Sequence, residues 1–340
     1  MQVRNLDEIS FIRPILIILL IIVHCFTVFN GGWPPFIGYR DCTSYMWLSR
    51  TCYSFMLETF TFVSGYVWAY QILDLHKKTS LIVLVKKKFE RLILPSIVFS
   101  FLYLQLFNNK GCVNFAIGGG KTILLVFSGV GHLWYLPLLF WCFIVMWIVE
   151  KIRVSDKVKL IILLVLAILP FPSLPFQLYR VAYYLFFFFV GYKVWQYGDS
   201  YRKNIKLKKV IISWSVFAAI FIGLRLLTAH LVEMSETAPF IAKVVLKITS
   251  TSCKMVYSMA GVVAMYSTAV WFTNNYKLSK SYINIGSLCF GVYVYQEFII
   301  KYLYYFSDLP IKVGYINLPW IAFGVTLALS LLLAKTAKSL

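Results

Sequence analysis

The first apolar stretch of the sequence contains two side chains that could take part in chemistry, Arg13 and His24. Arginine binds phosphate groups through paired hydrogen bonds, and histidine accepts a proton or carries an acyl group near neutral pH. At 1.5 Å of rise per residue the two lie about 16 Å apart along a helix, close to three full turns, so one face should present both. Each also has a structural explanation, Arg13 as an interfacial anchor and His24 as a buried histidine bonded to a neighbouring helix.

Other ionisable residues also fall inside apolar stretches, namely Glu58, Arg225, Glu297 and Lys301. A charged group at the centre of a bilayer costs about 2.5 kcal/mol or more, so each is predicted to face the protein interior, to reach the interface, or to serve a function. Glu58 could pair with Arg225 or line a polar cavity. Glu297 and Lys301 stand four residues apart on one helix and could neutralise each other.

A second cluster, His132, Trp134 and Tyr135, opens a later apolar stretch. Trp and Tyr at such a position fit the aromatic belt at a membrane interface. Their rings could also stack on the faces of sugars, and His132 could reach a hydroxyl group. Both interpretations stay open at this point.

These stretches belong to a chain that cannot be a soluble globular protein. Of its 340 residues, 60% are hydrophobic and only 14% are charged, and the mean hydropathy is +0.77. Soluble domains are about 45–50% apolar and about 25% charged. The net charge of +20 would suggest nucleic acid in a soluble protein, but here the basic residues stand in short loops between apolar runs, so no nucleic-acid partner is expected. The seven cysteines show no CxxC pair, and no metal site is predicted.

A membrane-spanning helix needs about 20 predominantly apolar residues. The sequence predicts about ten such helices, which make an all-α, polytopic membrane bundle without a separate soluble domain. Their approximate ranges are 11–29, 51–72, 92–107, 133–149, 159–170, 181–196, 210–229, 255–271, 285–306 and 319–333. The fifth is the shortest, near 12 residues, and would span only if it were tilted or the bilayer were locally thinner.

The basic residues predict the orientation of these helices. With the N-terminus in the cytoplasm, most of the 33 lysines and arginines fall in cytoplasmic segments, and basic loops alternate with basic-poor ones along the chain. We therefore expect a multi-pass protein of the cell (inner or plasma) membrane with both termini in the cytoplasm. The lipid bilayer is its first partner, and the oligomeric state does not follow from the sequence.

Taken in order, these segments resemble the acyltransferase-3 family of ten-helix membrane enzymes that acylate bacterial envelope glycans. Arg13 and His24 match an R-x10-H motif on the first helix. The other similar segments are Phe60–Tyr66 with F-x-F-x-S-G-[FY], Arg91–Pro95 with R-L-x-x-P, His132–Leu136 with H-L-W-[FY]-L, and Gly291–Gln296 with G-x-Y-x-x-H. The resemblance covers essentially the whole chain, which is expected to form one acyltransferase domain over residues 1–340. At the end of the last motif Gln296 replaces a histidine, so any proton transfer by that histidine must be absent here or fall to Glu297.

The resemblance implies a membrane O-acyltransferase that moves an acetyl or other short acyl group from acyl-CoA to a hydroxyl of a cell-envelope glycan. A lipid-linked or nascent saccharide is the hypothesis for the acceptor. Acyl-CoA is then a co-substrate, and no bound cofactor is expected. His24 and Arg13 are the predicted catalytic residues. The predicted acyl-CoA-binding residues are Arg13, Lys87, Lys88 and Arg91, and those of the acceptor site or cavity are Glu58, Ser64, His132, Trp134, Tyr135, Tyr293, Gln296 and Glu297.

Two other functions compete with this one. A transporter or flippase for a glycan or lipid would also have many helices, aromatic residues and buried charges, but it would not need the pair of Arg13 and His24. A different class of membrane acyltransferase, built around a histidine deep in the chain, fits less well because His230 lies near a helix end and no histidine follows it. Consumption of acyl-CoA separates an acyltransferase from a transporter.

Overall fold

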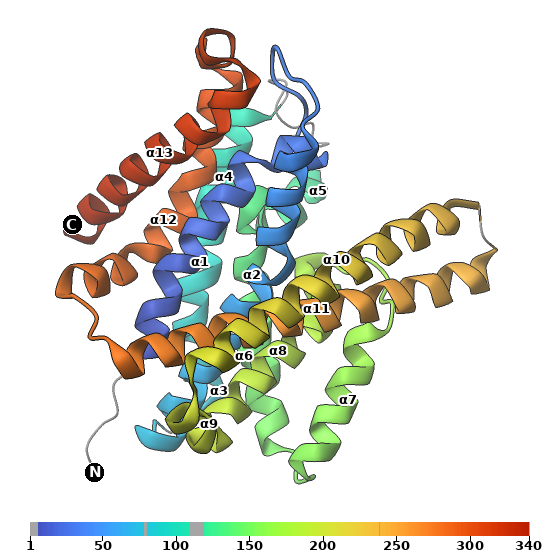
Figure 1. Ribbon diagram of the computed structural model, residues 1–340, viewed down its shortest axis with the longest axis vertical. Coiled ribbons are helices and arrows are strands. Elements are labelled where there is room, and N and C mark those ends of the chain that lie inside the picture. Colours follow the sequence, from blue (N-terminus) through green and yellow to red (C-terminus); the bar gives the residue numbers. More distant parts are fainter. Residues whose placement is uncertain (1–5, 78–79, 109–118, 238, 340) are drawn as a thin grey trace.

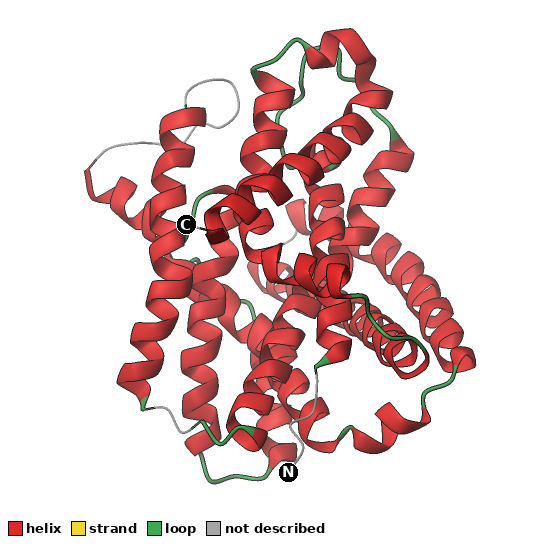
Figure 2. Ribbon diagram, turned by 90° about the vertical axis from the view of Figure 1, so that its left-hand side faces the viewer, coloured by secondary structure: helices red, strands yellow, loops and turns green. Residues whose placement is uncertain are grey.

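The computed structural model describes residues 6–77, 80–108, 119–237 and 239–339, and within these ranges it contains helices and no strands (Figure 2). The all-α bundle predicted from the sequence is confirmed. The α-helices are α1 (Asp7–Cys25), α2 (Thr43–Ala69), α3 (Leu81–Lys88), α4 (Leu94–Phe107), α5 (Gly119–Ser128), α6 (Tyr135–Lys151), α7 (Asp156–Ile168), α8 (Leu178–Tyr197), α9 (Asp199–Asn204), α10 (Leu207–Thr237), α11 (Phe240–Asn275), α12 (Lys280–Tyr305) and α13 (Leu309–Ser339).

Short irregular helices join some of these elements. They are 3-10 turns at Thr27–Asn30, Gly131–Trp134 and Pro175–Gln177, and π-turns at Tyr70–Asp74 and Phe89–Ile93. The second π-turn joins α3 to α4, so that the two continue one another as a single long helical segment. π-turns often occur at functional sites, and this one contains Arg91.

Each of the ten predicted ranges overlaps a helix of the structure. Among the described residues, seven helical segments are long and apolar enough to cross a membrane: α1, α3–α4, the segment Gly131–Lys151, α10, α11, α12 and α13. Helix α7 has 13 residues, which is short for a span. Helices α2 and α8 are long enough, but they are rich in tyrosine, serine or threonine, which lower their hydropathy. The protein is a multi-pass membrane protein, while the count of ten spans stays a prediction.

Helix α1 lies in the middle of the bundle and packs against α2, α11, α12 and α13 (Figure 1). It begins at the lower end of the molecule in Figure 1 and ends at the upper end, and these two names are used below. The predicted orientation would place the lower end in the cytoplasm. Helices α10 and α11 form a hairpin that projects to one side of the bundle.

The motif segment Phe60–Tyr66 holds α2 against α8. A Cβ atom added at Gly65 would lie 1.9 Å from the carbonyl oxygen of Phe188, and one added at Gly191 would lie 2.0 Å from that of Phe62. Only residues without a side chain allow two helices to approach this closely, as is common in membrane bundles. At the lower end, the Tyr66 hydroxyl donates a hydrogen bond to the buried carboxylate of Glu8 in α1. This motif therefore fixes the relative positions of α1, α2 and α8.

Candidate active site

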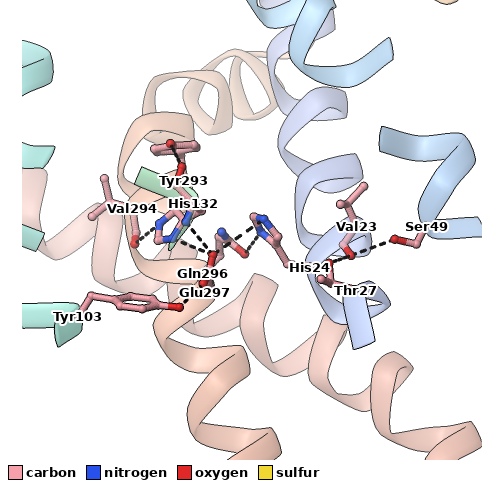
Figure 3. A network of polar contacts seen from close by, with 10 residues as sticks. All are labelled: Val23, His24, Thr27, Ser49, Tyr103, His132, Tyr293, Val294, Gln296 and Glu297. Carbon is pink, nitrogen blue, oxygen red and sulfur yellow. Dashed lines mark hydrogen bonds and ion pairs between the residues drawn. The ribbon is translucent and has the colours of Figure 1, made fainter. Parts of the chain in front are cut away.

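His24 lies in the last turn of α1 and faces α12 (Figure 3). Its Nδ1 atom is 2.9 Å from Oε1 of Gln296. Because an amide oxygen only accepts hydrogen bonds, this contact places a proton on Nδ1 and leaves the lone pair on Nε2. The Nε2 atom is 3.9 Å from Oε2 of Glu297, which is too long for a hydrogen bond but within reach of a charge interaction. The geometry therefore presents His24 as a base whose cationic form would be stabilised by a carboxylate.

Three groups hold the carboxylate of Glu297, whose side chain is only 2% exposed. The Tyr103 hydroxyl donates to Oε1 over 2.6 Å, and the backbone N–H of His132 donates to Oε2 over 3.1 Å. The ring Nδ1 of His132 lies 3.0 Å from the same Oε2. A buried carboxylate is costly unless it is paired and hydrogen-bonded, and these contacts meet that condition.

His132 is engaged on both sides of its ring. Its Nε2 lies 3.1 Å from the carbonyl oxygen of Val294, and its Nδ1 faces Glu297. The carbonyl oxygen of His132 in turn accepts a 2.5 Å hydrogen bond from the Tyr293 hydroxyl. Both ring nitrogens of His132 therefore contact protein oxygens, whereas His24 has one ring nitrogen, Nε2, that is not in hydrogen-bond contact with another described residue.

Two glycines shape the 3-10 turn that carries His132. Gly129 and Gly131 have φ angles of +79° and +56°, which residues with a side chain rarely adopt. A Cβ atom at Gly131 would also lie 3.0 Å from Oε1 of Glu297. The turn itself, which precedes α6, brings the backbone N–H of His132 onto the carboxylate, and this explains how two distant motifs meet.

Trp33, in the connection between α1 and α2, covers His24. The two rings are nearly parallel, with centroids 5.9 Å apart and an interplanar angle of 11°. On the same Trp33 ring, the Nζ atom of Lys301 lies 4.2 Å from the centroid. Nothing in the sequence singles out Trp33 or Tyr103 as site residues, since neither has a spacing relation to His24 along the chain.

Arg13 lines a separate cavity of about 310 Å³ below this network. Its walls are mostly apolar and come from α1, α2, the end of the π-turn, α6 and α12. They include Ile17, Ser64, Tyr135 and Tyr293. Tyr293 connects the two regions, because its ring lines the cavity and its hydroxyl binds the His132 backbone. Arg13 and His24 thus lie in neighbouring regions, a cavity and a polar network, that are joined through Tyr293.

The predicted basic cluster also gathers around a cavity. Lys87, Lys88 and Arg91 line a pocket of about 320 Å³ with Trp68 and Lys77 at the lower end of the molecule. The Nζ atom of Lys88 lies 3.3 Å from the centroid of the Phe143 ring. Leu92, the next residue after Arg91, lines the Arg13 cavity, so the two cavities are adjacent along the π-turn.

The remaining predicted residues occupy other places. The Ser64 hydroxyl donates to the carbonyl oxygen of Phe60, and the Tyr135 hydroxyl is 2.8 Å from that of Thr61. The guanidinium of Arg180 lies over the Trp134 ring, with its Cζ atom 4.1 Å from the ring centroid. Glu58 does not join the His24 network; it contacts Tyr183 and Lys254 elsewhere in the bundle.

The fold and the site together define a multi-pass membrane protein with a cluster of titratable side chains, His24, His132 and Glu297, in its core. A family model described as an acyltransferase domain (Acyl_transf_3) matches residues 6–335, nearly the whole chain. The chain belongs to this family and is a membrane acyltransferase. No curated protein and no solved structure was found to match it.

Proposed function

We propose that this acyltransferase moves an acetyl or similarly short acyl group from acyl-CoA to a hydroxyl of a cell-envelope glycan, with His24 as the general base. One observation carries the proposal: the 2.9 Å contact of His24 Nδ1 with Gln296, which leaves Nε2 as a proton acceptor 3.9 Å from Glu297. Family membership favours this function over that of a transporter.

The lower end of the molecule suits the acyl donor. Coenzyme A carries phosphate groups on its nucleotide and a long, thin, largely uncharged arm that ends in the thioester. Lys87, Lys88 and Arg91 provide cations for the phosphates, and the adjacent apolar cavity of Arg13 provides a path for the arm. In the predicted orientation, both cavities face the cytoplasm, where acyl-CoA is made.

The transfer step needs a base with an available lone pair. The acceptor hydroxyl oxygen attacks the thioester carbonyl carbon while its proton passes to His24 Nε2. The new C–O bond then replaces the C–S bond, and the thiolate of coenzyme A takes the proton back from His24 as it leaves. Between these events His24 is a cation, and the nearby carboxylate of Glu297 stabilises it.

Gln296 has two functions in this scheme. Its Oε1 atom fixes the tautomer and orientation of His24. Its buried Nε2 atom has no hydrogen-bond partner among the described residues, so it is available to donate to the oxyanion that forms at the thioester carbonyl. The glutamine thus replaces the histidine of the family motif as a positioning residue, and no second histidine base is needed on α12.

The upper end suits the acceptor. His24 is 14% exposed and lies beneath Trp33, whose ring could stack on a sugar once it moves from His24. We place the acceptor, a lipid-linked or nascent saccharide, on the outer side of the cell membrane. We also propose that the protein lies in the cell membrane with both of its termini in the cytoplasm.

The test measures free coenzyme A thiol released by the purified protein in nanodiscs. A panel of short acyl-CoA donors is supplied with and without a membrane glycan extract. We expect release that depends on both the acyl-CoA and the extract. A folded protein that releases no thiol with any donor and extract would contradict the proposal and favour the transporter as its function.

A further inference from the structure

A third cavity, of about 260 Å³, lies away from the His24 network, where the α10–α11 hairpin meets α2. Its lining contains three cationic side chains, Arg50, Arg225 and Lys254, and no aspartate or glutamate among the described residues. Asn30, Tyr53 and Tyr257 add hydrogen-bonding groups to the same walls. Arg225 lies inside the predicted span 210–229, whereas Arg50 and Lys254 stand directly before the predicted spans 51–72 and 255–271. The cavity therefore gathers three cations near one membrane interface, an arrangement that attracts an anion.

The charge around this cavity is only partly balanced by the protein. The carboxylate of Glu58 is 1% exposed and does not line the cavity, but its Oε1 lies 3.5 Å from Nζ of Lys254. Glu58 also accepts a hydrogen bond from Tyr183 over 3.1 Å. Three cations against one carboxylate leave an excess of two positive charges. The Nε atom of Arg225 is buried and has no hydrogen-bond partner among the described residues.

The cavity opens near the upper end of α1, the end that carries His24. Asn30, one of its lining residues, lies six positions after His24 in the 3-10 turn that follows α1. The Asn30 side chain donates to the Ser49 hydroxyl over 2.8 Å, and this hydroxyl lies next to the Val23 carbonyl oxygen. Figure 3 shows Ser49 on the side of α1 opposite to the Gln296 and Glu297 side chains. The cavity and the base therefore flank the same helix end from two sides.

We propose that this cavity binds a phosphate group carried by the acceptor. Arginine guanidinium groups recognise phosphate oxygens in pairs, and a phosphate monoester or diphosphate carries the charge that balances the excess here. A phosphate held in the cavity would tether an acceptor beside the end of α1 while its sugar hydroxyl reaches His24. The identification of the ligand as the acceptor rests on the proposed acyl transfer, but the phosphate site itself does not.

The experiment measures equilibrium binding to the full chain in nanodiscs of neutral phosphatidylcholine, without acyl-CoA. One arm uses radiolabelled inorganic pyrophosphate, and the other uses a radiolabelled polyprenyl diphosphate inserted in the discs. Tighter binding of the second probe identifies a lipid-borne diphosphate, and equal binding identifies a phosphate that needs no lipid tail. Binding of neither probe overturns the proposal.

Variants locate the bound phosphate. Arg225→Gln should weaken binding by about tenfold or more, because a charge-assisted hydrogen bond is lost. Glu58→Gln should tighten binding several-fold, since it removes the competing carboxylate, and a gain of this kind cannot arise from misfolding. Lys247→Gln is the control: this lysine is exposed on α11, two turns from Lys254 and outside the cavity. Unchanged affinity in Arg225→Gln, or no gain in Glu58→Gln, would contradict the assignment.

Because the assay contains no acyl-CoA, its result is separable from the proposed function. Phosphate binding that depends on Arg225, in a protein that transfers no acyl group, would leave this site standing and remove acyl transfer to a glycan. Acyl transfer that is insensitive to Arg225→Gln, in a protein that binds neither probe, would do the reverse.

Discussion

Glu297→Gln removes one charge from the centre of the site and keeps the size of the side chain. In the native protein, Oε2 of Glu297 lies 3.9 Å from Nε2 of His24. Two opposite unit charges near 4 Å apart attract by about 4 kcal/mol at an effective dielectric constant of about 20. This attraction exists only when His24 carries the proton, which is during the transfer step.

The expected result is a fall in kcat of about a thousandfold, since each 1.36 kcal/mol corresponds to about a factor of ten. The KM for acyl-CoA should change little, because Glu297 lines neither of the two donor cavities. The assay is steady-state release of coenzyme A thiol by the purified protein. Glu233→Gln, at an exposed residue of α10, provides the matched control.

The same substitution also affects stability. The two oxygens of Glu297 accept from different donors, the Tyr103 hydroxyl and the His132 N–H. A glutamine can offer an oxygen to only one of them, so a buried donor is left unsatisfied at a cost of about 1–3 kcal/mol. Thermal unfolding must therefore show a folded variant at the assay temperature. A folded Glu297→Gln protein that keeps a third or more of the native kcat would refute the assigned function of this carboxylate.

Three further substitutions test other parts of the account. Gln296→Leu should lower kcat by about 10–100-fold at unchanged acyl-CoA KM, because His24 loses the acceptor that orients it; equal loss with a raised KM would argue for a donor-binding function instead. Arg13→Gln should raise the KM for acyl-CoA by about tenfold, and an unchanged KM would exclude Arg13 from donor binding. Gly191→Ala should destabilise the protein by about 1–3 kcal/mol in thermal unfolding, since its Cβ would clash with the Phe62 carbonyl. Gly223→Ala on α10 is the control and should not destabilise it, because a Cβ there meets nothing within 4 Å. Equal stability of the two variants would contradict the α2–α8 packing.

The fold was predictable from the sequence because hydropathy and basic loops mark helices in a membrane protein. Each predicted range overlaps a helix, including the short segment that became α7. The irregular segments between the helices were harder to predict from the sequence. No pattern in residues 89–93 predicts a π-turn. In this turn, Arg91 lines one cavity and Leu92 lines the adjacent one.

The site was predictable in its members but not in their contacts. The sequence suggested His24, His132, Gln296 and Glu297, and the structure brings these four together. The sequence could not show that His132 contacts Glu297, because this contact depends on a turn with positive φ angles at Gly129 and Gly131. The sequence also allowed a pair of Glu58 with Arg225, and the structure instead places Lys254 beside Glu58.

The most direct test of the account follows the acyl group itself. Radiolabelled acetyl-CoA is incubated with a membrane glycan extract and the purified protein in nanodiscs, comparing the native chain with His24→Ala and with His230→Ala, a substitution at an exposed histidine of α10. We predict label in the glycan fraction for the native protein and for His230→Ala, and a loss of at least about a thousandfold in His24→Ala. A folded His24→Ala protein that transfers label at the native rate would contradict the central claim that His24 is the base.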